Sequence, residues 1–543
     1  MNEYPYDGDS ISLEDIERQS QESRWWEVDV DEAPEPQPVT KREKYVYKVG
    51  ELSDTVDFIE KIILKNNLMF FDRGGNLVRP IIAERAATEG RTIVAATLTP
   101  VSGPYIIKQM SKIIDWVKLK KVKTKPGDPE EFEEISIDPP LPIGTTILAN
   151  AGDWGFHQIA GIVTAPTLRR DGTILWKEGF DPRTKLLLIS PPKMPPFPEN
   201  PTRADAVKSI QRLASLLEGF PFVSDVDKSV ALSGLITPIC RAAMTVAPLH
   251  AISAPTAGSG KSFLVDLFSG LISGTAAPAT PVGKVEEETE KRLSSAMMEG
   301  APIIVLDNVN GQLYGDALCQ CVERPIVKFR VLGESRMMEI ENKATIFATG
   351  NNISLVDDMT RRTILCSLDA QMERPEMRQF NFNPLAEILD NRGQYIADAL
   401  TVVRAYKLAG SPDKLPQLAS FGEWSDLVRS AIVWLGFPDP LKSMDKVRDA
   451  DGRLDSLKAF IAAWYSADPT GKKSAAEIVE FSLANVEMQV AMKSFCSSRG
   501  VVDGVSLGKR LHSVKDRVVD GFKIVSDKDS HTKTNIWRLQ RVE

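Results

Sequence analysis

The stretch SAPTAGSGKS, residues 253–262, carries the residue types of a phosphate-binding loop. The pattern for such a loop is G-x-x-x-x-G-K-[ST], which Gly260, Lys261 and Ser262 meet, whereas Pro255 stands at its first glycine. In this pattern backbone N–H groups cradle phosphate, the lysine reaches the β- and γ-phosphates, and the hydroxyl is a ligand of Mg²⁺. The residues expected to hold the nucleotide are Pro255, Thr256, Ala257, Gly258, Ser259, Gly260, Lys261, Ser262 and Phe263.

The segments on either side of this loop suit the same chemistry. The apolar run LHAISA (249–254) predicts a buried strand, and KSFLVDLFSGLI after the loop has helical apolar spacing. Strand, turn and helix in that order bring the N–H groups of the helix start onto phosphate. Pro255 is tolerable at the strand exit because proline fixes φ without adding bulk at Gly258 and Gly260, where the chain must wrap the phosphates.

A second strand predicts the metal ligand. Ile303–Leu306 is a short apolar run that ends in Asp307, and a carboxylate at the tip of the neighbouring strand can hold Mg²⁺ through water. Asn308 stands where a second acid is expected, and an amide cannot act as a general base. Asn308 therefore positions the attacking water, or another carboxylate takes the proton. Glu287, within an acidic cluster at a helix start, is the candidate base, although such positions favour acids for structural reasons too.

A third apolar run and an arginine pair complete the set. The run ATIFATGNN ends in Asn351 and Asn352, and an amide at this strand end can orient water against the γ-phosphate. Arg361 and Arg362 follow ten residues later, where an arginine of one subunit could reach the nucleotide of its neighbour and stabilise transition-state charge. An arginine pair is also a common surface feature.

In this order the motifs resemble the superfamily 3 helicase core of phage, prophage and plasmid replication proteins, a branch of the AAA+ ATPases. The resemblance covers roughly residues 205–440. It implies an α/β P-loop NTPase fold, ATP and Mg²⁺, and assembly into a ring, with a hexamer expected. The two departures from the family pattern are Pro255 and Asn308.

The resemblance also implies how DNA is held and which partners act. In the family, the stretch corresponding to Val327–Lys343 is a β-hairpin that grips one DNA strand in the ring channel. The DNA-contact candidates carried over are Lys328, Arg330, Arg336 and Lys343. Single-stranded or forked DNA is the expected partner, and priming is expected from another protein. The expected location is the cytoplasm, that of a bacterial host if a phage or prophage encodes the chain.

Six segments are expected along the chain. They are an acidic disordered tail (1–44), an N-terminal mixed α/β domain (45–190), a proline-rich linker (191–203), the ATPase core (204–385), a helical lid (386–450) and a C-terminal winged-helix-like DNA-binding domain (451–543). The last assignment rests on a helix candidate, LGKRLHSVKDRVV, followed by two β-like runs and a local net charge of +5 over residues 491–543. A capping domain without a nucleic-acid role is its alternative.

Charge and composition limit the function classes. The net charge of −8 belongs to the tail, since residues 1–40 hold twelve acids against Arg18 and Arg24. That tail is either a solvated leader or, with Trp25 and Trp26, a partner-docking or DNA-mimicking peptide. No run of about 18 apolar residues and no apolar leader is present, so neither a membrane span nor a secretory signal is expected. The five cysteines are expected to be reduced packing residues.

Three further interpretations remain open at this stage. One concerns the lysines around Trp116, which form either a phosphate-contacting face or the wet side of one amphipathic helix: Lys112, Lys118, Lys120, Lys121, Lys123 and Lys125. The chain could be an ATPase that does not unwind DNA, such as a helicase loader or an origin-binding initiator. It could also be a nucleic-acid-binding scaffold that binds ATP and hydrolyses it weakly.

Overall fold

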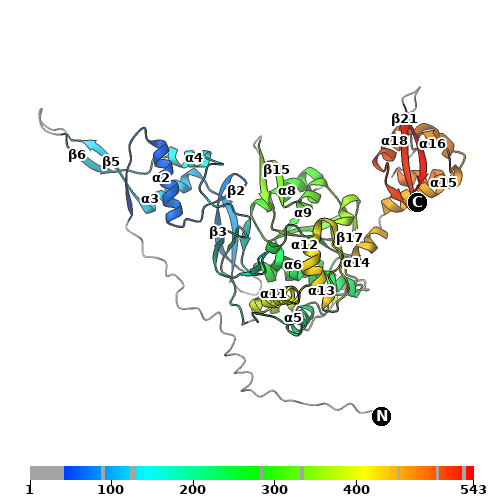
Figure 1. Ribbon diagram of the computed structural model, residues 1–543, viewed down its shortest axis with the longest axis horizontal. Coiled ribbons are helices and arrows are strands. Elements are labelled where there is room, and N and C mark those ends of the chain that lie inside the picture. The colour runs from blue at the N-terminus through cyan, green and yellow to red at the C-terminus, as the bar shows by residue number, and fades with distance from the viewer. Residues whose placement is uncertain are drawn as a thin grey trace, which may run out of the picture.

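The computed structural model describes residues 42–86, 92–122, 130–196, 198–281, 283, 285–330, 336–449, 452–496, 501–528 and 534–542. Successive groups of elements form an N-terminal part, a large central body and a smaller C-terminal body (Figure 1). Residues 1–41 of the predicted acidic tail (1–44) lie outside the described residues. Both interpretations of the tail therefore stay predictions.

The central body contains a five-stranded sheet that is parallel throughout. Its strands are β12 (Leu249–Ala254), β13 (Ala279–Pro281), β14 (Ile303–Leu313), β17 (Thr345–Leu355) and β18 (Thr363–Ser367), in the order β13-β14-β17-β12-β18. All six residues of β12 are buried, as expected for a central parallel strand covered on both faces. The prediction of a mixed α/β fold around a parallel sheet is therefore confirmed.

Two details of this sheet differ from the sequence prediction. The strand that carries Asp307 is not the neighbour of β12, because β17 lies between β12 and β14. Nor does β14 end at Asp307, since it continues to Leu313 after an irregularity between Leu306 and Val309. The prediction was wrong on both points because strand order and β-bulges depend on partner strands that a local apolar run does not reveal.

Helices surround the sheet and share one hydrophobic cluster with it. Those in the first half of the body are α5 (Arg203–Ser215), α6 (Asp225–Cys240), α7 (Lys261–Ser273), α8 (Glu286–Met298) and α9 (Asp316–Glu323). The second half adds α10 (Pro384–Asp390), α11 (Arg392–Leu408), α12 (Gly422–Trp424), a π-helical turn (Ser425–Arg429), α13 (Ser430–Trp434) and α14 (Lys442–Asp449). Residues such as Leu400, Tyr406 and Trp424 are fully buried in that cluster, so most of the expected lid packs into the body.

The described residues of the N-terminal part form three helices and four small sheets. Its elements are β1 (Glu43–Val46), α2 (Leu52–Lys65), β2 (Phe71–Arg73), β3 (Asn76–Ala86), β4 (Thr92–Pro100), α3 (Gly103–Ile113), β5 (Ile114–Lys121), β6 (Phe132–Ser136) and α4 (Pro142–Ala149). The short strands β7 (Gly161–Val163), β8 (Thr167–Leu168), β9 (Ile174–Leu175), β10 (Gly179–Asp181) and β11 (Leu186–Leu188) follow. Antiparallel hairpins turn at Gly74–Gly75, between β2 and β3, and at Asp171–Gly172, between β8 and β9.

The lysine-rich stretch after α3 is a strand, not the second half of a helix. Residues Ile114–Lys121 form β5, in which Trp116 is buried and Lys118 is exposed. Because residues two apart in a strand share a face, Lys118 and Lys120 follow Trp116 along one side of β5, and the interpretation as the wet side of one amphipathic helix was wrong.

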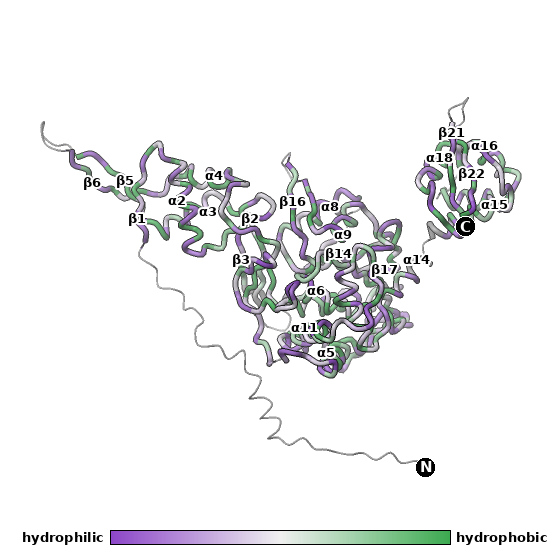
Figure 2. The backbone as a smooth tube through the Cα atoms, viewed as in Figure 1, coloured by the Kyte–Doolittle hydropathy of each residue, from purple (hydrophilic) through white to green (hydrophobic). Residues whose placement is uncertain are grey.

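The C-terminal body has a hydrophobic cluster of its own. Its elements are α15 (Gly452–Ala467), β19 (Lys473–Ser474), α16 (Ala475–Ser482), α17 (Val486–Phe495), α18 (Gly504–Ser513), β20 (Val518–Val519), β21 (Phe522–Lys528) and β22 (Asn535–Arg541). The strands form an antiparallel sheet in the order β19-β22-β21-β20. Hydrophobic and hydrophilic residues alternate along these elements, green and purple in Figure 2, as amphipathic segments around a shared core require.

The described residues contain no candidate membrane span, no grouped metal ligands and no disulfide. No described helix is both long and apolar enough to cross a membrane. Within the same residues, no three His, Cys, Asp or Glu side chains are grouped as a metal site. The five cysteines are all free, and Cys240, Cys321 and Cys366 are buried.

Candidate functional site

The loop 255–260 connects β12 to α7 at the carboxyl edge of the sheet. Gly258 and Gly260 adopt φ values of 76° and 92°, a region that glycine enters without steric cost. Gly260 is the N-cap of α7, and no side chain among the described residues caps this helix. The first N–H groups of α7 are consequently directed at the concave side of the loop, as phosphate binding requires.

Two hydroxyls and a lysine stabilise the loop from inside. Ser259 is buried, and its Oγ donates a hydrogen bond to the Thr256 carbonyl at 2.9 Å. Lys261 Nζ donates to the same carbonyl, also at 2.9 Å. Burial lowers the pKa of Lys261, and the nearby charge of Asp307 opposes that effect. The ammonium therefore lies within electrostatic reach of the Asp307 carboxylate.

Asp307 lies beside the hydroxyl of Ser262. The Oγ of Ser262 on α7 is 3.3 Å from Oδ1 of Asp307 on β14, although β17 separates β14 from β12, the strand that leads into the loop and α7. The ladder between β14 and β17 is interrupted between Leu306 and Val309, which takes Asp307 and Asn308 out of regular pairing. Asn308 occupies the left-handed region with φ of 57°, where asparagine is among the best-tolerated residues. The bulge thus re-aims the Asp307 side chain towards α7.

Thr349 on β17 is a residue that the sequence reasoning missed. This buried side chain donates a short hydrogen bond to Oδ1 of Asp307, and the N–H of Asn308 points at its Oγ1 from 3.4 Å. In the sequence, Thr349 belongs to an apolar run and cannot be distinguished from an ordinary β-branched core residue. Only the strand order, with β17 between β12 and β14, reveals its position against the carboxylate.

A second carboxylate lies further along α7. Asp266 follows Ser262 by one helical turn, so the two side chains share a helix face. Burial raises the pKa of Asp266, the amide of Ala277 at 3.0 Å lowers it, and the charge of Asp307 raises it further.

Asn351 lies level with the start of the loop. In the register of β12 and β17 it pairs with Ala254, the last residue of β12. Its Oδ1 is buried and has no hydrogen-bond partner within the described part of the chain. Because buried acceptors are rarely left unpaired, this oxygen fits a site that receives a donor from bound water or ligand.

The two candidate finger arginines have different environments. Arg361 ends the 3₁₀ turn η3 (Asp357–Arg361), and its side chain is 57% exposed and 3.0 Å from Asp358. The side chain of Arg362 is only 7% exposed, is held by a short ion pair to Glu323 and also contacts Asp358 at 3.1 Å. Arg362 is thus paired within its own subunit, and of the two arginines only Arg361 is exposed enough to reach a neighbouring subunit.

Among the described residues, no contact joins Glu287 to Asp307. It lies in the first turn of α8, is 75% exposed and pairs with Lys291 at 2.8 Å. The hydrogen bond from Lys291 lowers its pKa, which is the opposite of what a general base near neutral pH needs. The next residue along the cluster towards the N-terminus, Glu286, accepts the N–H of Asp316 at 2.6 Å and joins α8 to α9.

The predicted hairpin is present as β15 (Ile326–Arg330) and β16 (Met337–Glu341). Lys328 is exposed and pairs across the hairpin with Glu339 at 2.7 Å, and Arg330 is exposed at the end of β15. Arg336 donates to Asn76 of the N-terminal part. Lys343 lies beyond the hairpin, is 18% exposed and points to the Met244 carbonyl at 3.4 Å, so it faces the body.

A cavity of about 560 Å³ lies beside the loop, and of its aromatic lining only Phe263 was expected from the sequence. Phe220, Phe263, Phe380 and Phe382 contribute aromatic surface, and Gly258, Ser259 and Gly260 form the wall shared with the loop. The rings of Phe220 and Phe263 are stacked with centroids 6.1 Å apart. These phenylalanines are distant in sequence and follow no spacing pattern, so no sequence signal grouped them.

The polar groups of this cavity are largely engaged. Asn383 accepts the N–H groups of Leu385 and Ala386 at 3.2 Å and so caps α10. Arg378 donates a short hydrogen bond to the Gly219 carbonyl, and its guanidinium lies 5.0 Å from the Phe380 ring centre. The cavity therefore offers mainly flat apolar surface to a ligand that reaches it from the loop.

Comparisons with known proteins identify no family. No family model and no curated protein matches the chain. Among solved structures, an apo A form of the NrS-1 C-terminal region is 11% identical with a TM-score of 0.32, covering 81% of this chain and 100% of that one. A second such structure is 10% identical with a TM-score of 0.34, covering 89% and 99%. Similarity at this level does not establish a shared fold.

Proposed function

We propose that the chain is an ATP-dependent DNA helicase of the superfamily 3 type, acting as a ring on single-stranded or forked DNA. The observation that carries the proposal is the 3.3 Å approach of Ser262 Oγ to Asp307 Oδ1 beside Lys261, at the start of α7. A hydroxyl and a carboxylate at that distance suit a Mg²⁺ ion that accompanies a triphosphate.

Each residue of the site then has a task. Residues 255–260 and the first N–H groups of α7 hold the phosphates, and Lys261 neutralises their charge. Ser262 and Asp307 would hold Mg²⁺, which when bound polarises the phosphoryl oxygens. Asn351 directs its buried, unpartnered oxygen to a water near the γ-phosphate. The base of the nucleotide lies against the phenylalanines of the adjoining cavity.

Ring assembly and DNA contact use residues away from the loop. Arg361 reaches the nucleotide of a neighbouring subunit, because it is the exposed member of the arginine pair. Lys328 and Arg330 on β15 contact the phosphates of one DNA strand inside the ring. Movement of the hairpin during the ATP cycle draws the strand through.

One observation favours a second candidate, an ATP-binding scaffold with weak hydrolysis. Beside Asp307 stands the amide Asn308, and Glu287 is paired with Lys291 on the surface of α8. A site without a base hydrolyses ATP slowly even when it binds ATP well. The C-terminal body, with α18 followed by antiparallel strands, favours a further variant in which a non-unwinding ATPase recognises an origin or loads another helicase.

Phosphate release with and without single-stranded DNA separates these candidates. We expect the wild type to hydrolyse ATP, DNA to stimulate it, and Lys261→Ala to remove the activity with the fold intact. Lys208→Ala, at an exposed position on α5, is the matched control and should keep full activity. Binding without hydrolysis would favour the scaffold, and hydrolysis without displacement of a forked duplex strand would favour the initiator or loader. Full activity in Lys261→Ala would refute the site.

A further inference from the structure

The turn between β2 and β3 contacts the hairpin β15–β16, although more than 250 residues separate them in sequence. The amide of Asn76 donates to Sδ of Met338 at 2.9 Å and accepts from Arg336 at 2.5 Å. In Figure 1, β15 rises from the central body on the side where β2 lies. One turn of the N-terminal part thus touches the second strand of the hairpin near its outer end.

Gly74 makes this contact a tight one. Its φ is 59°, and a Cβ atom added there would lie 2.6 Å from the Glu339 carbonyl oxygen and 2.7 Å from Cγ of Met338. Real Cβ atoms do not approach a backbone oxygen so closely, so the two backbones fit only because position 74 carries no side chain. The hairpin cannot tilt towards the turn without a clash.

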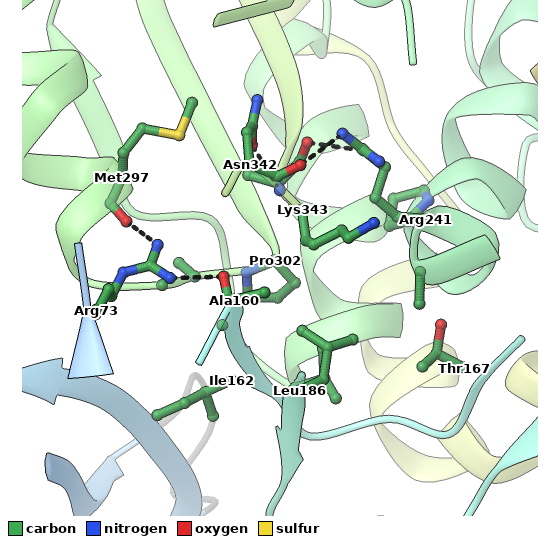
Figure 3. A pocket seen from close by; sticks show the side chains of 17 residues that line it. Arg73, Ala160, Ile162, Thr167, Leu186, Arg241, Met297, Pro302, Asn342 and Lys343 are labelled. Atoms are coloured by element: carbon green, nitrogen blue, oxygen red, sulfur yellow. Dashed lines mark hydrogen bonds between the residues drawn. The ribbon is translucent and has the colours of Figure 1, made fainter. Parts of the chain in front are cut away.

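Arg73 fixes the turn to the central body. Its guanidinium is buried and donates to the carbonyls of Met297 and Ala160 (Figure 3). It also donates to those of Met298, the last residue of α8, and Ile159. Every bond goes to a rigid backbone oxygen, so the arginine holds one geometry. Burial lowers the pKa of Arg73 to about 10, and the charge of Glu341 on β16 opposes that shift.

An ion pair also holds the base of the hairpin. Lys185, just before β11, contacts Glu341 at the end of β16 at 3.1 Å. The N-terminal part therefore contacts β16 near both of its ends, while Lys328 and Arg330 on β15 stay exposed. The same part is anchored to α8, the helix that precedes the Asp307 strand β14.

We propose that the β2–β3 turn, Arg73–Asn76, is a positioning element that holds the DNA-contacting hairpin at a fixed angle to the ATPase body. This inference rests on the proposed function, since it takes β15–β16 as the part that contacts DNA. The turn touches neither nucleotide nor DNA. Because the turn contacts both α8 and β16, a shift of α8 during the nucleotide cycle moves β16 with it. Without the turn, the hairpin would be free to stay behind.

Two variants of the full-length chain test the inference. Gly74→Ala forces a Cβ against the Glu339 carbonyl, and Asn76→Ala removes both side-chain bonds to the hairpin. We expect amide hydrogen exchange in residues 326–330 and 337–341 to rise about threefold to tenfold in each. We also expect the ratio of DNA-stimulated to basal ATP hydrolysis to fall by about the same factor, with the basal rate unchanged.

Two controls separate contact from strain. Gly152→Ala places an alanine at φ of 102° with nothing within 4 Å of the new Cβ. It therefore introduces backbone strain without a clash against the hairpin. This variant should behave as wild type. Asn76→Asp keeps the acceptor for Arg336 and should restore most of the stimulation ratio.

Each outcome decides something. Unchanged exchange in the hairpin of both variants overturns the inference, as does faster exchange with an unchanged stimulation ratio. If DNA stimulates no hydrolysis in the wild type, the proposed function fails, and faster exchange in the two variants still supports the positioning role of the turn.

Discussion

The carboxylate of Asp307 on β14 lies 3.3 Å from the hydroxyl of Ser262, which is 45 residues away in the chain and belongs to α7. The distance is short because α7 begins directly after the loop and because the bulge in β14 takes Asp307 out of the ladder. Neither residue would hold a metal alone, so the site depends on both segments.

Thr349 orients the Asp307 carboxylate, and its hydroxyl is the feature to remove. We expect Thr349→Val to raise the Mg²⁺ concentration for half-maximal ATP hydrolysis about 10- to 100-fold, the usual effect of losing a group that orients a metal ligand. Thr349→Ser keeps the hydroxyl and should stay near wild type. A magnesium titration of phosphate release gives the answer, and identical curves for Val and wild type would exclude this role.

Arg361 and Arg362 should separate into a functional and a structural residue. Arg361→Ala removes only a surface ion pair, worth at most about 1 kcal/mol, yet should reduce hydrolysis in the assembled ring about 10³-fold. Arg362→Ala leaves Glu323, in a position mostly shielded from solvent, with the Ser420 hydroxyl but without its charge partner, and should lower the free energy of unfolding by about 2–3 kcal/mol. Chemical denaturation and ATPase assays of mixed rings measure the two effects. Equal behaviour of both variants would contradict the division.

The phenylalanine cavity should bind the base with little discrimination. Stacking on an aromatic ring contributes about 1–2 kcal/mol, so Phe263→Ala should weaken ATP binding about 5- to 30-fold. Because Asn383 and Arg378 are engaged elsewhere, GTP and ATP should bind with Kd values within about threefold of each other. Phe132→Ala, at an exposed ring on β6, is the control. Calorimetric titration checks both points, and a strong preference for one purine would argue against stacking alone.

His250 should make the central body acid-sensitive. Burial lowers its pKa to about 3, against about 6.5 in the unfolded chain, so between these values the unfolded state binds a proton that the folded state excludes. Stability contributed by the neutral ring is therefore full above pH 6.5 and falls by up to about 1.4 kcal/mol per pH unit below it. His250→Phe should show a flatter dependence in urea denaturation between pH 7 and 4.5. Parallel curves for the two proteins would rule out His250 as the cause.

Local patterns were sufficient for the parts of the fold that lie close together in sequence. The strand, glycine turn and helix around Lys261 follow from residues 249–273 alone, since the apolar run and the helical spacing adjoin the loop. The hairpin turns at Gly74–Gly75 and Asp171–Gly172 were predictable for the same reason. Each of these features is encoded by a few neighbouring residues.

Features that depend on distant segments were not predictable in this way. The insertion of β17 between β12 and β14 decides that Thr349 contacts Asp307, and no local run states strand order. The cavity beside the loop joins Phe220, Phe263, Phe380 and Phe382 from three separate segments. Arg362 is buried in an ion pair with Glu323 on α9, whereas Arg361 is exposed. The two adjacent arginines in the sequence do not indicate which of them pairs with Glu323.

The hydrophobic cluster of residues 457–537 shares no side chain with the cluster that surrounds the parallel sheet. Because cooperative melting depends on a common core, we expect the central and C-terminal bodies to unfold as two separate units. Calorimetry would then record separate endotherms, and a substitution such as Trp464→Ala would shift one of them and leave the other in place. The small C-terminal body can accordingly vary in evolution without any repacking of the central body.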